Sequence, residues 1–176
     1  MNKTLAGRIF LTGFMGAGKS TVGRELARRL GCPFIDLDRL IEETAGTTIA
    51  EIFSTHGENY FRQLETNTLT GLPSAEACVY ATGGGIFMSE DNRRFMRSTG
   101  RVVYLRAEWQ TLKSRLAGSR DRPLLSAEDD WSSVKNLYTM RTPAYADADL
   151  VVSTDDKSVE QVAAEIFKEL SRRCYE

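Results

Sequence analysis

The stretch Gly13-Phe14-Met15-Gly16-Ala17-Gly18-Lys19-Ser20 fits the pattern G-x-x-x-x-G-K-[ST], the phosphate-binding loop called Walker A. The apolar residues 9–11 before it predict a strand, and residues 21–30 after it predict a helix. A phosphate loop connects a strand to a helix in the same way. The flanking segments therefore favour a nucleotide-binding loop over an ordinary glycine-rich turn.

The residue types of this loop suit a nucleoside triphosphate. Glycines let successive backbone N–H groups converge on phosphate oxygens, and the positive end of the following helix dipole points at the same anion. Lys19 is expected to reach the terminal phosphates, and the hydroxyl of Ser20 is expected to bind Mg²⁺. The candidate nucleotide-binding residues here are Gly16, Ala17, Gly18, Lys19, Ser20 and Thr21.

Composition and charge restrict the other classes of function. The length of 176 residues suits one domain, so we expect a single domain over residues 1–176. The formal net charge of −1 provides no overall field that would favour nucleic acid or an anionic membrane. No apolar run has the length of a membrane span, and the first residues lack the apolar core of a secretory signal. We therefore expect a cytoplasmic protein.

The three cysteines, Cys32, Cys78 and Cys174, lie far apart in the sequence and form no C-x-x-C pair. This spacing argues against a zinc site and against a framework of disulfides. We expect isolated thiols.

Strands and helices are predicted to alternate along the rest of the chain. Apolar runs predict further strands at residues 34–36, 78–81, 101–105 and 150–152. Helices are predicted at residues 39–45, 58–72, 89–97, 109–116 and 130–141, and capping-box patterns at residues 48–51 and 158–161 open two more, the first of which ends at Gly57. This alternation predicts a three-layer α/β/α fold around a parallel sheet, with the helical pieces of residues 39–72 inserted beside the sheet.

Two carboxylates follow the second predicted strand. Asp36 and Asp38 stand where that strand ends, at the edge of a parallel sheet where ligands bind. Phosphoryl transfer needs a carboxylate near the metal and a group that orients or deprotonates the acceptor. Asp36 suits the first role and Asp38 the second. A structural alternative makes Asp38 the N-cap of a helix that begins at Arg39.

Glycines and arginines mark further candidate segments. Thr82-Gly83-Gly84-Gly85 ends the strand 78–81 and suggests close approach of the backbone to a ligand. Residues 117–125 are polar and broken by glycine and proline, which suits a mobile lid over phosphates or an ordinary surface loop. Arginines, which bind planar carboxylates and phosphates through two parallel hydrogen bonds, stand at Arg62, Arg115, Arg120, Arg122 and Arg141.

Together these motifs resemble those of shikimate kinase, a small enzyme that phosphorylates the 3-hydroxyl of shikimate with ATP. The resemblance covers nearly the whole chain and is far more specific than the phosphate loop alone. Besides that loop, it is carried by Phe34-Ile35-Asp36-Leu37-Asp38, Ile52-Phe53 with Gly57-Glu58, Phe61-Arg62 with Glu65, Thr82-Gly83-Gly84-Gly85, Arg122-Pro123-Leu124-Leu125, and Arg141 with Tyr145.

The resemblance implies a fold and a division of roles. The implied fold is that of nucleoside monophosphate kinases, with a five-stranded parallel sheet, a substrate-binding insertion at about residues 37–65 and a lid at about residues 117–129. Asp38 is implied to contact the shikimate hydroxyls and to serve as the candidate base. Asp36 is implied to hold Mg²⁺ through water, beside Ser20 as a direct ligand.

The resemblance also implies how the acid substrate is held. Arg62 and Arg141 bind the shikimate carboxylate, and the backbone around Gly84 and Gly85 makes further contacts. Glu65, three residues beyond Arg62, is expected to orient that arginine. The expected partners are ATP and shikimate, and we expect a monomer.

Cations around the phosphates complete the implied site. Arg122 is implied to move in with the lid toward the transferring phosphate and to share catalysis with Asp38 and Lys19, and Arg115 is implied to flank the adenine. The chain departs from the family pattern next to Arg141. Met140 and Ala144 stand where the family often has Glu and Leu, which leaves the packing behind the arginine open.

Two other functions are weighed against this one. A gluconate kinase shares the fold and also phosphorylates a small acid, but the motif of Arg62 and Glu65 together with Arg141 suits a ring carboxylate better. A regulatory module that binds nucleotide without turnover is the second alternative. No missing group favours that module, because the chain retains Lys19, Ser20, Asp36, Asp38 and Arg122.

Overall fold

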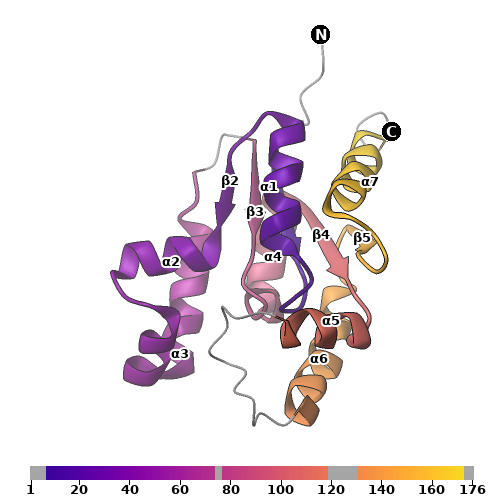
Figure 1. Cartoon of the computed structure of the whole chain (residues 1–176). Helices are drawn as coiled ribbons and strands as arrows, with labels where there is room; N and C mark the ends of the chain where they lie inside the picture. Colours follow the sequence, from indigo (N-terminus) through magenta and orange to yellow (C-terminus); the bar gives the residue numbers. More distant parts are fainter. Residues whose placement is uncertain (1–6, 74–76, 119–130, 173–176) are drawn as a thin grey trace.

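A computed structural model describes residues 7–73, 77–118 and 131–172 (Figure 1). Within these residues, five strands form one parallel sheet in the order β2-β3-β1-β4-β5. The strands are β1 (Arg8–Thr12), β2 (Phe34–Asp36), β3 (Cys78–Ala81), β4 (Gly100–Arg106) and β5 (Leu150–Ser153). The predicted positions of the strands and the parallel sheet are confirmed.

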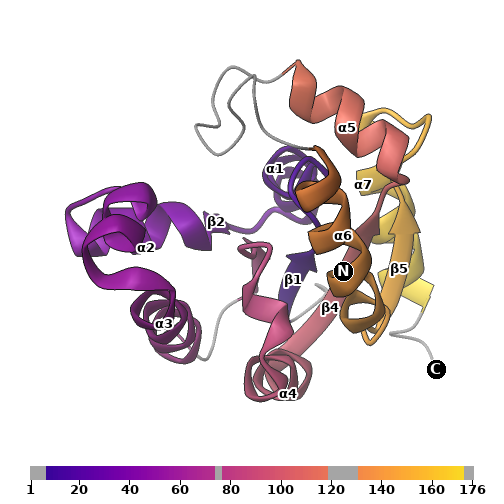
Figure 2. The same cartoon turned by 90° about the horizontal axis from the view of Figure 1, so that it is seen from below.

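Helices cover both faces of this sheet. Figure 1 and Figure 2 show α1 and α7 side by side over one face and α4 over the opposite face, so that the fold has the three predicted layers. The helices are α1 (Lys19–Leu30), α2 (Leu37–Ala45), α3 (Ile49–Thr70), the short 3₁₀ helix η1 (Ile86–Met88), α4 (Glu90–Thr99), α5 (Trp109–Ala117), α6 (Trp131–Tyr145) and α7 (Val159–Arg172).

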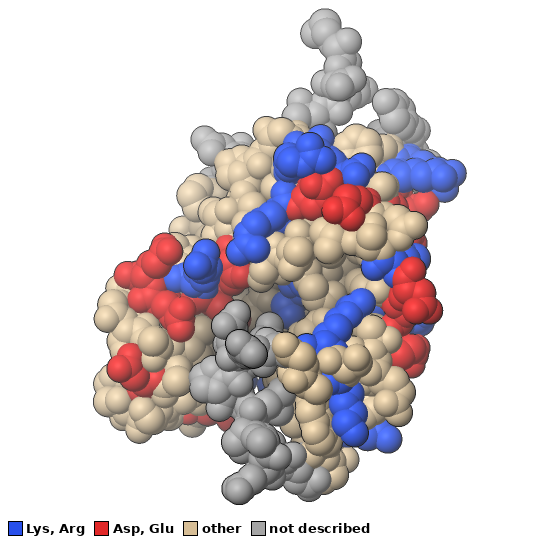
Figure 3. All heavy atoms as spheres, in the orientation of Figure 1, with Lys and Arg blue, Asp and Glu red and all other residues tan. Residues whose placement is uncertain are grey.

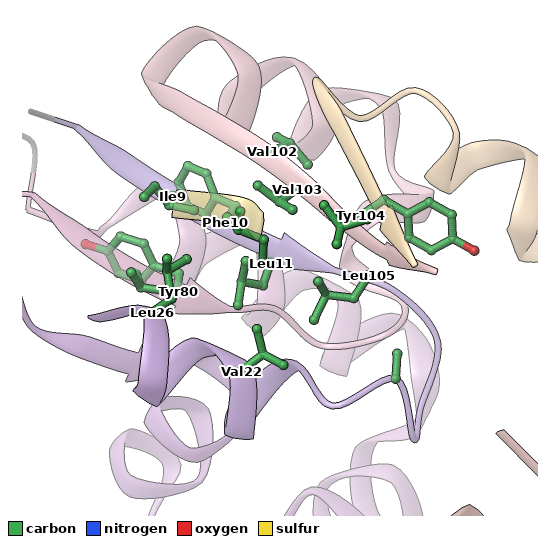
Figure 4. Close-up of a cluster of buried hydrophobic side chains, with 14 of the residues drawn as sticks. Ile9, Phe10, Leu11, Val22, Leu26, Tyr80, Val102, Val103, Tyr104 and Leu105 are labelled. Atoms are coloured by element: carbon green, nitrogen blue, oxygen red, sulfur yellow. The ribbon is translucent and has the colours of Figure 1, made fainter. Parts of the chain in front are cut away.

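Part of the core lies between the sheet and α1. Strands β1 and β3 are buried along their whole length because helices cover them on both faces. Figure 4 shows Val22 and Leu26 of α1 directed at the side chains of the sheet, among them Leu11 and Tyr80. Gly23 lets α1 approach closely, since a Cβ there would lie 2.5 Å from the Phe34 ring. This packing fixes both ends of the phosphate loop.

The insertion beside the sheet consists of α2 and α3, which project past β2 (Figure 1). The predicted capping box is present, because the Thr48 side chain accepts from the backbone of Glu51 and the Glu51 side chain accepts from the backbone of Thr48. Gly57 interrupts α3 with φ 80° and ψ 175°, where the sequence predicted a helix end. A separate small cluster of Ile41, Ile52 and Phe61 holds α2 against α3.

Helix α6 is longer than predicted. The sequence pattern ended this helix at Arg141, whereas it continues through Pro143 to Tyr145. A proline inside a helix removes one backbone hydrogen bond. The ring of Tyr145 is fully buried and stacks on Tyr104 at 5.1 Å, which stabilises the last turn of the helix.

The surface carries charges of both signs. In Figure 3 the blue Lys and Arg side chains and the red Asp and Glu side chains are interspersed over the visible face. Among the described residues, no helix has the length and apolarity to cross a membrane. Cys32 is half-buried and Cys78 is buried, both as thiols, and Cys174 lies outside the described residues.

Candidate active site

The phosphate loop joins β1 to α1 with the backbone that its glycines permit. Gly13, Gly16 and Gly18 have φ values of 142°, 80° and 90°. A Cβ at Gly13 would also lie 2.6 Å from the carbonyl oxygen of Leu105. Gly18 caps α1 without any side-chain hydrogen bond, so no side chain at the N-cap covers the start of the helix. Such a helix start suits an anion.

Two cations lie against the loop. Nζ of Lys19 donates to the carbonyl oxygens of Gly13 at 2.9 Å and Phe14 at 3.1 Å. Arg115, from α5, donates to the carbonyl oxygen of Gly16 at 3.3 Å and also binds Thr154 after β5. The structure thus brings Lys19 and Arg115 to the loop.

Ser20 and Asp36 form the candidate metal site. Oγ of Ser20 donates to Oδ2 of Asp36 at 2.5 Å, which joins α1 to the end of β2. Hydroxyl and carboxylate oxygens are the ligands that Mg²⁺ prefers, and this ion usually takes only one or two of them from the protein. These two residues therefore fit the predicted magnesium site.

The alternative interpretation, in which Asp38 is the N-cap of the following helix, is wrong. Asp36 is the N-cap of α2, and its Oδ1 accepts from the backbone N–H of Asp38 at 3.2 Å. The helix begins at Leu37, two residues earlier than predicted, because Asp36 provides the capping oxygen at the end of the strand. Asp38 therefore lies in the first turn of α2, where its side chain does not cap the helix.

Asp38 and Glu65 converge on the glycine turn after β3. A Cβ at Gly83 would lie 2.6 Å from Oδ1 of Asp38 and 2.9 Å from Oε1 of Glu65. Burial raises the pKa of Glu65, which is 2% exposed; the neighbouring charge of Asp38 acts in the same direction and Arg62 opposes it. The site thus holds two carboxylates at one point, and only a residue without a side chain fits between them.

Arg62 lies on the other side of this turn. Its Nη1 donates to Oε2 of Glu65 at 2.6 Å, which confirms the predicted interaction of these two residues. Its Nη2 donates to Oε1 of Glu58 at 3.0 Å. The guanidinium lies directly against Gly85, where a Cβ would overlap it. The glycine turn therefore positions Arg62 as well as Asp38.

Arg141 and Tyr145 reach the same turn from α6. Nη1 of Arg141 would lie 3.5 Å from a Cβ at Gly84, and the same Cβ would be 3.8 Å from the carbonyl oxygen of Gly13 in the phosphate loop. The Tyr145 hydroxyl donates to the carbonyl oxygen of Gly84. The turn thus connects the two arginines to the phosphate loop.

Sequence reasoning assigned no role to Tyr145, although its spacing of four residues from Arg141 was a signal, because residues i and i+4 share a helix face. Burial raises the pKa of Tyr145 to about 12, so the hydroxyl keeps its proton and remains a hydrogen-bond donor. Met140 is 77% exposed, so it does not pack behind Arg141.

A pocket of about 500 Å³ lies beside this cluster, between α3, η1 and α4, with Arg62, Gly85 and Arg141 in its lining. No ion pair joins Arg141 to a carboxylate among the residues that the structure describes. Arg122 and residues 119–130 of the predicted lid lie outside the described residues.

Comparisons with known proteins identify relatives of this chain. The sequence model of the shikimate kinase family matches residues 15–171. Shikimate kinase of Geobacter sulfurreducens is 51% identical over 158 residues, which cover 90% of this chain and 87% of the relative. Shikimate kinase of Geobacter metallireducens is 46% identical, and the match covers 94% of this chain and 92% of the relative.

Solved structures extend the comparison to the fold. Shikimate kinase from Acinetobacter baumannii in complex with shikimate superimposes with a TM-score of 0.89 at 37% identity, covering 97% of this chain and 96% of that one. A gluconokinase from Sinorhizobium meliloti 1021 has a TM-score of 0.60 at 16% identity over 97% of this chain and 95% of its own, a likeness of fold alone. The extent and identity of these matches show that the chain belongs to the shikimate kinase family.

Proposed function

We propose that this chain transfers the γ-phosphoryl group of ATP to the 3-hydroxyl of shikimate, giving shikimate 3-phosphate and ADP. The observation that carries the proposal is the glycine turn after β3, where Asp38, Arg62 and Arg141 meet beside the phosphate loop. A carboxylate and two guanidinium groups suit a small acid that carries hydroxyls. The family relation and the shikimate-bound relative from Acinetobacter baumannii support this choice of acid.

On the donor side, the phosphate loop binds ATP. The N–H groups at the start of α1 and the ammonium group of Lys19 hold the β- and γ-phosphates and stabilise the charge that develops on them. Arg115 lies close enough to the loop to flank the nucleotide. We propose Arg122 as a further cation that approaches the transferring phosphate, as the family resemblance implies.

Mg²⁺ fits this site as the cofactor of ATP. When bound, the ion spreads the charge of the β- and γ-phosphates. Ser20 is proposed as its direct ligand and Asp36 as a ligand through water, because their oxygens already lie together at 2.5 Å.

On the acceptor side, Arg62 and Arg141 bind the carboxylate of shikimate and so turn its 3-hydroxyl toward the γ-phosphate. The hydroxyl oxygen forms the new bond to phosphorus, and the bond from phosphorus to the β–γ bridging oxygen breaks. Asp38 orients the hydroxyl and accepts its proton, and ADP leaves with the electron pair. Glu65 fixes Arg62, and Tyr145 fixes the carbonyl of Gly84.

The reaction belongs to the biosynthesis of aromatic amino acids through chorismate. We propose that the protein carries it out as a cytoplasmic monomer. The test is ADP release by the purified protein, which must depend on both shikimate and Mg²⁺. Turnover of gluconate without turnover of shikimate would overturn the proposed substrate, and ATP binding without any transfer would leave a regulatory module.

A substitution at Asp38 tests its proposed role. Asp38→Asn keeps the size of the side chain but removes the basic oxygen, so we expect kcat to fall by ~10² or more while ATP binding stays nearly intact. Steady-state kinetics with saturating shikimate and titration of a fluorescent ATP analogue measure these two quantities. A kcat close to that of the wild type would remove Asp38 from the role of base.

A further inference from the structure

Arg62 is engaged by two carboxylates of its own helix. Its Nη1 donates to Oε2 of Glu65 at 2.6 Å, while Nε and Nη2 both donate to Oε1 of Glu58, at 3.3 Å and 3.0 Å. A guanidinium has five N–H donors in a planar fork. The edge formed by Nε and Nη2 is one of those that bind a planar carboxylate through two hydrogen bonds, and here Glu58 occupies it.

The two carboxylates differ in how firmly they hold the arginine. The Glu65 side chain is 2% exposed, whereas that of Glu58 is 65% exposed. If Glu65 turned away, it would leave a buried charge without its partner. Glu58 can turn into water at little cost, because an exposed pair four residues apart on a helix stabilises the paired state by a factor of only about two. Glu58 is therefore the exchangeable partner.

The position of Arg62 does not depend on Glu58. The guanidinium lies against the backbone of Gly85 and its Cζ is 5.5 Å from the centre of the Phe61 ring, while Glu65 fixes one of its ends. These contacts come from buried groups, since Phe61 is 4% exposed and Glu65 is 2% exposed. Removing Glu58 therefore leaves the arginine where it is and frees one edge of its fork.

The charge of Glu58 also acts on an incoming anion. Glu58, Arg62 and Arg141 line the same pocket of about 500 Å³. An acid that reaches the arginines meets a carboxylate already there, and like charges at close range repel each other. We propose that Glu58 stands in for the substrate carboxylate on Arg62 and is displaced by it, so that Glu58 lowers the affinity for the acid substrate. This inference rests on the proposed function, because it requires Arg62 to bind the carboxylate of shikimate.

The test is Glu58→Gln, which keeps the length of the side chain but removes its charge. We expect KM for shikimate to fall about two- to fivefold, the factor that corresponds to an exposed ion pair, while KM for ATP stays the same. Glu43→Gln is the matched control, since it removes the same charge from an exposed position of α2. We expect Glu43→Gln to leave both KM values unchanged.

Two further variants separate this inference from the proposed function. Arg62→Gln must weaken shikimate binding, measured by calorimetry; if it does not, the proposed role of Arg62 is wrong. In the Arg62→Gln background, Glu58→Gln should raise the affinity for shikimate less than it does in the wild type, because only the repulsion by its charge is then removed. If Arg62→Gln weakens binding but Glu58→Gln alone leaves KM for shikimate unchanged or raises it, the stand-in role of Glu58 is wrong and the proposed function stands.

Discussion

Gly83→Ala tests whether activity requires the position that the Asp38 carboxylate has next to the glycine turn. The new Cβ would lie 2.6 Å from Oδ1 of Asp38, whereas ordinary van der Waals contact begins at 3.4 Å. It would also lie 2.9 Å from Oε1 of Glu65, which is buried and bound to Arg62 and therefore yields less easily. The carboxylate of Asp38, on the first turn of α2, must then move by roughly 1 Å.

A displacement of this size determines the expected loss. Misplacing a reacting group by about 1 Å costs roughly 10²-fold in rate, or about 2.7 kcal/mol in the barrier. The backbone adds nothing to this cost, because Gly83 is not among the glycines with positive φ. We therefore expect kcat/KM for shikimate to fall about a hundredfold while the melting temperature changes by only a few degrees.

Gly84→Ala is the matched comparison, because the nearest neighbour of its Cβ is 3.5 Å away, at an ordinary contact distance. We expect it to lose much less activity, within about tenfold of the wild type. Both variants are assayed by coupled ADP release at saturating ATP with shikimate titrated, and thermal melting checks the fold. If Gly83→Ala keeps kcat/KM within about threefold of the wild type, the steric reasoning is refuted.

Two further predictions concern α6. Arg141→Lys should raise KM for shikimate about tenfold with little change in kcat, because an ammonium cannot form the two parallel hydrogen bonds of a guanidinium; steady-state kinetics measure both, and an unchanged KM would contradict the role. Burial raises the pKa of Tyr145 to about 12, so the folded state keeps a proton that the unfolded state loses near pH 10, and stability falls as the pH rises from 10 to about 12. Tyr145→Phe should reduce this fall in the free energy of unfolding by on the order of 2 kcal/mol, measured by urea titrations at pH 10 and pH 12. If the free energy of unfolding of the variant falls as much as that of the wild type, the prediction is wrong.

The sequence predicted the fold well where the signal was local. The strands β2 and β3 coincide with apolar runs bounded by glycine and proline, and the capping box of Thr48 and Glu51 depends on residues three positions apart. The sequence pattern ended α6 too early, because the burial of Tyr145 depends on Tyr104 in a distant strand. A local sequence pattern carries no information on a contact between residues so far apart in the chain.

The same distinction applies to the candidate site. The pairing of Arg62 with Glu65 follows from their spacing on one helix, and the structure confirms it. The convergence of Asp38 and Glu65 on Gly83 depends on how the insertion folds back over the end of β3. The hydrogen bond from Tyr145 to Gly84 spans 61 residues of sequence. Contacts of this range follow from the packing of whole elements and could not be read from neighbouring residues.

Asp36 has a consequence for how this protein can change. One oxygen of its carboxylate caps α2 at the backbone of Asp38, and the other accepts from Ser20 in the helix after the phosphate loop. A substitution of Asp36 that changes the proposed ligand of Mg²⁺ therefore also weakens the N-cap of α2, the helix that carries the proposed base. The candidate metal site and this helix cannot be altered separately at position 36. The donor and acceptor halves of the site are thus tied by one side chain, which narrows the replacements that position 36 can tolerate.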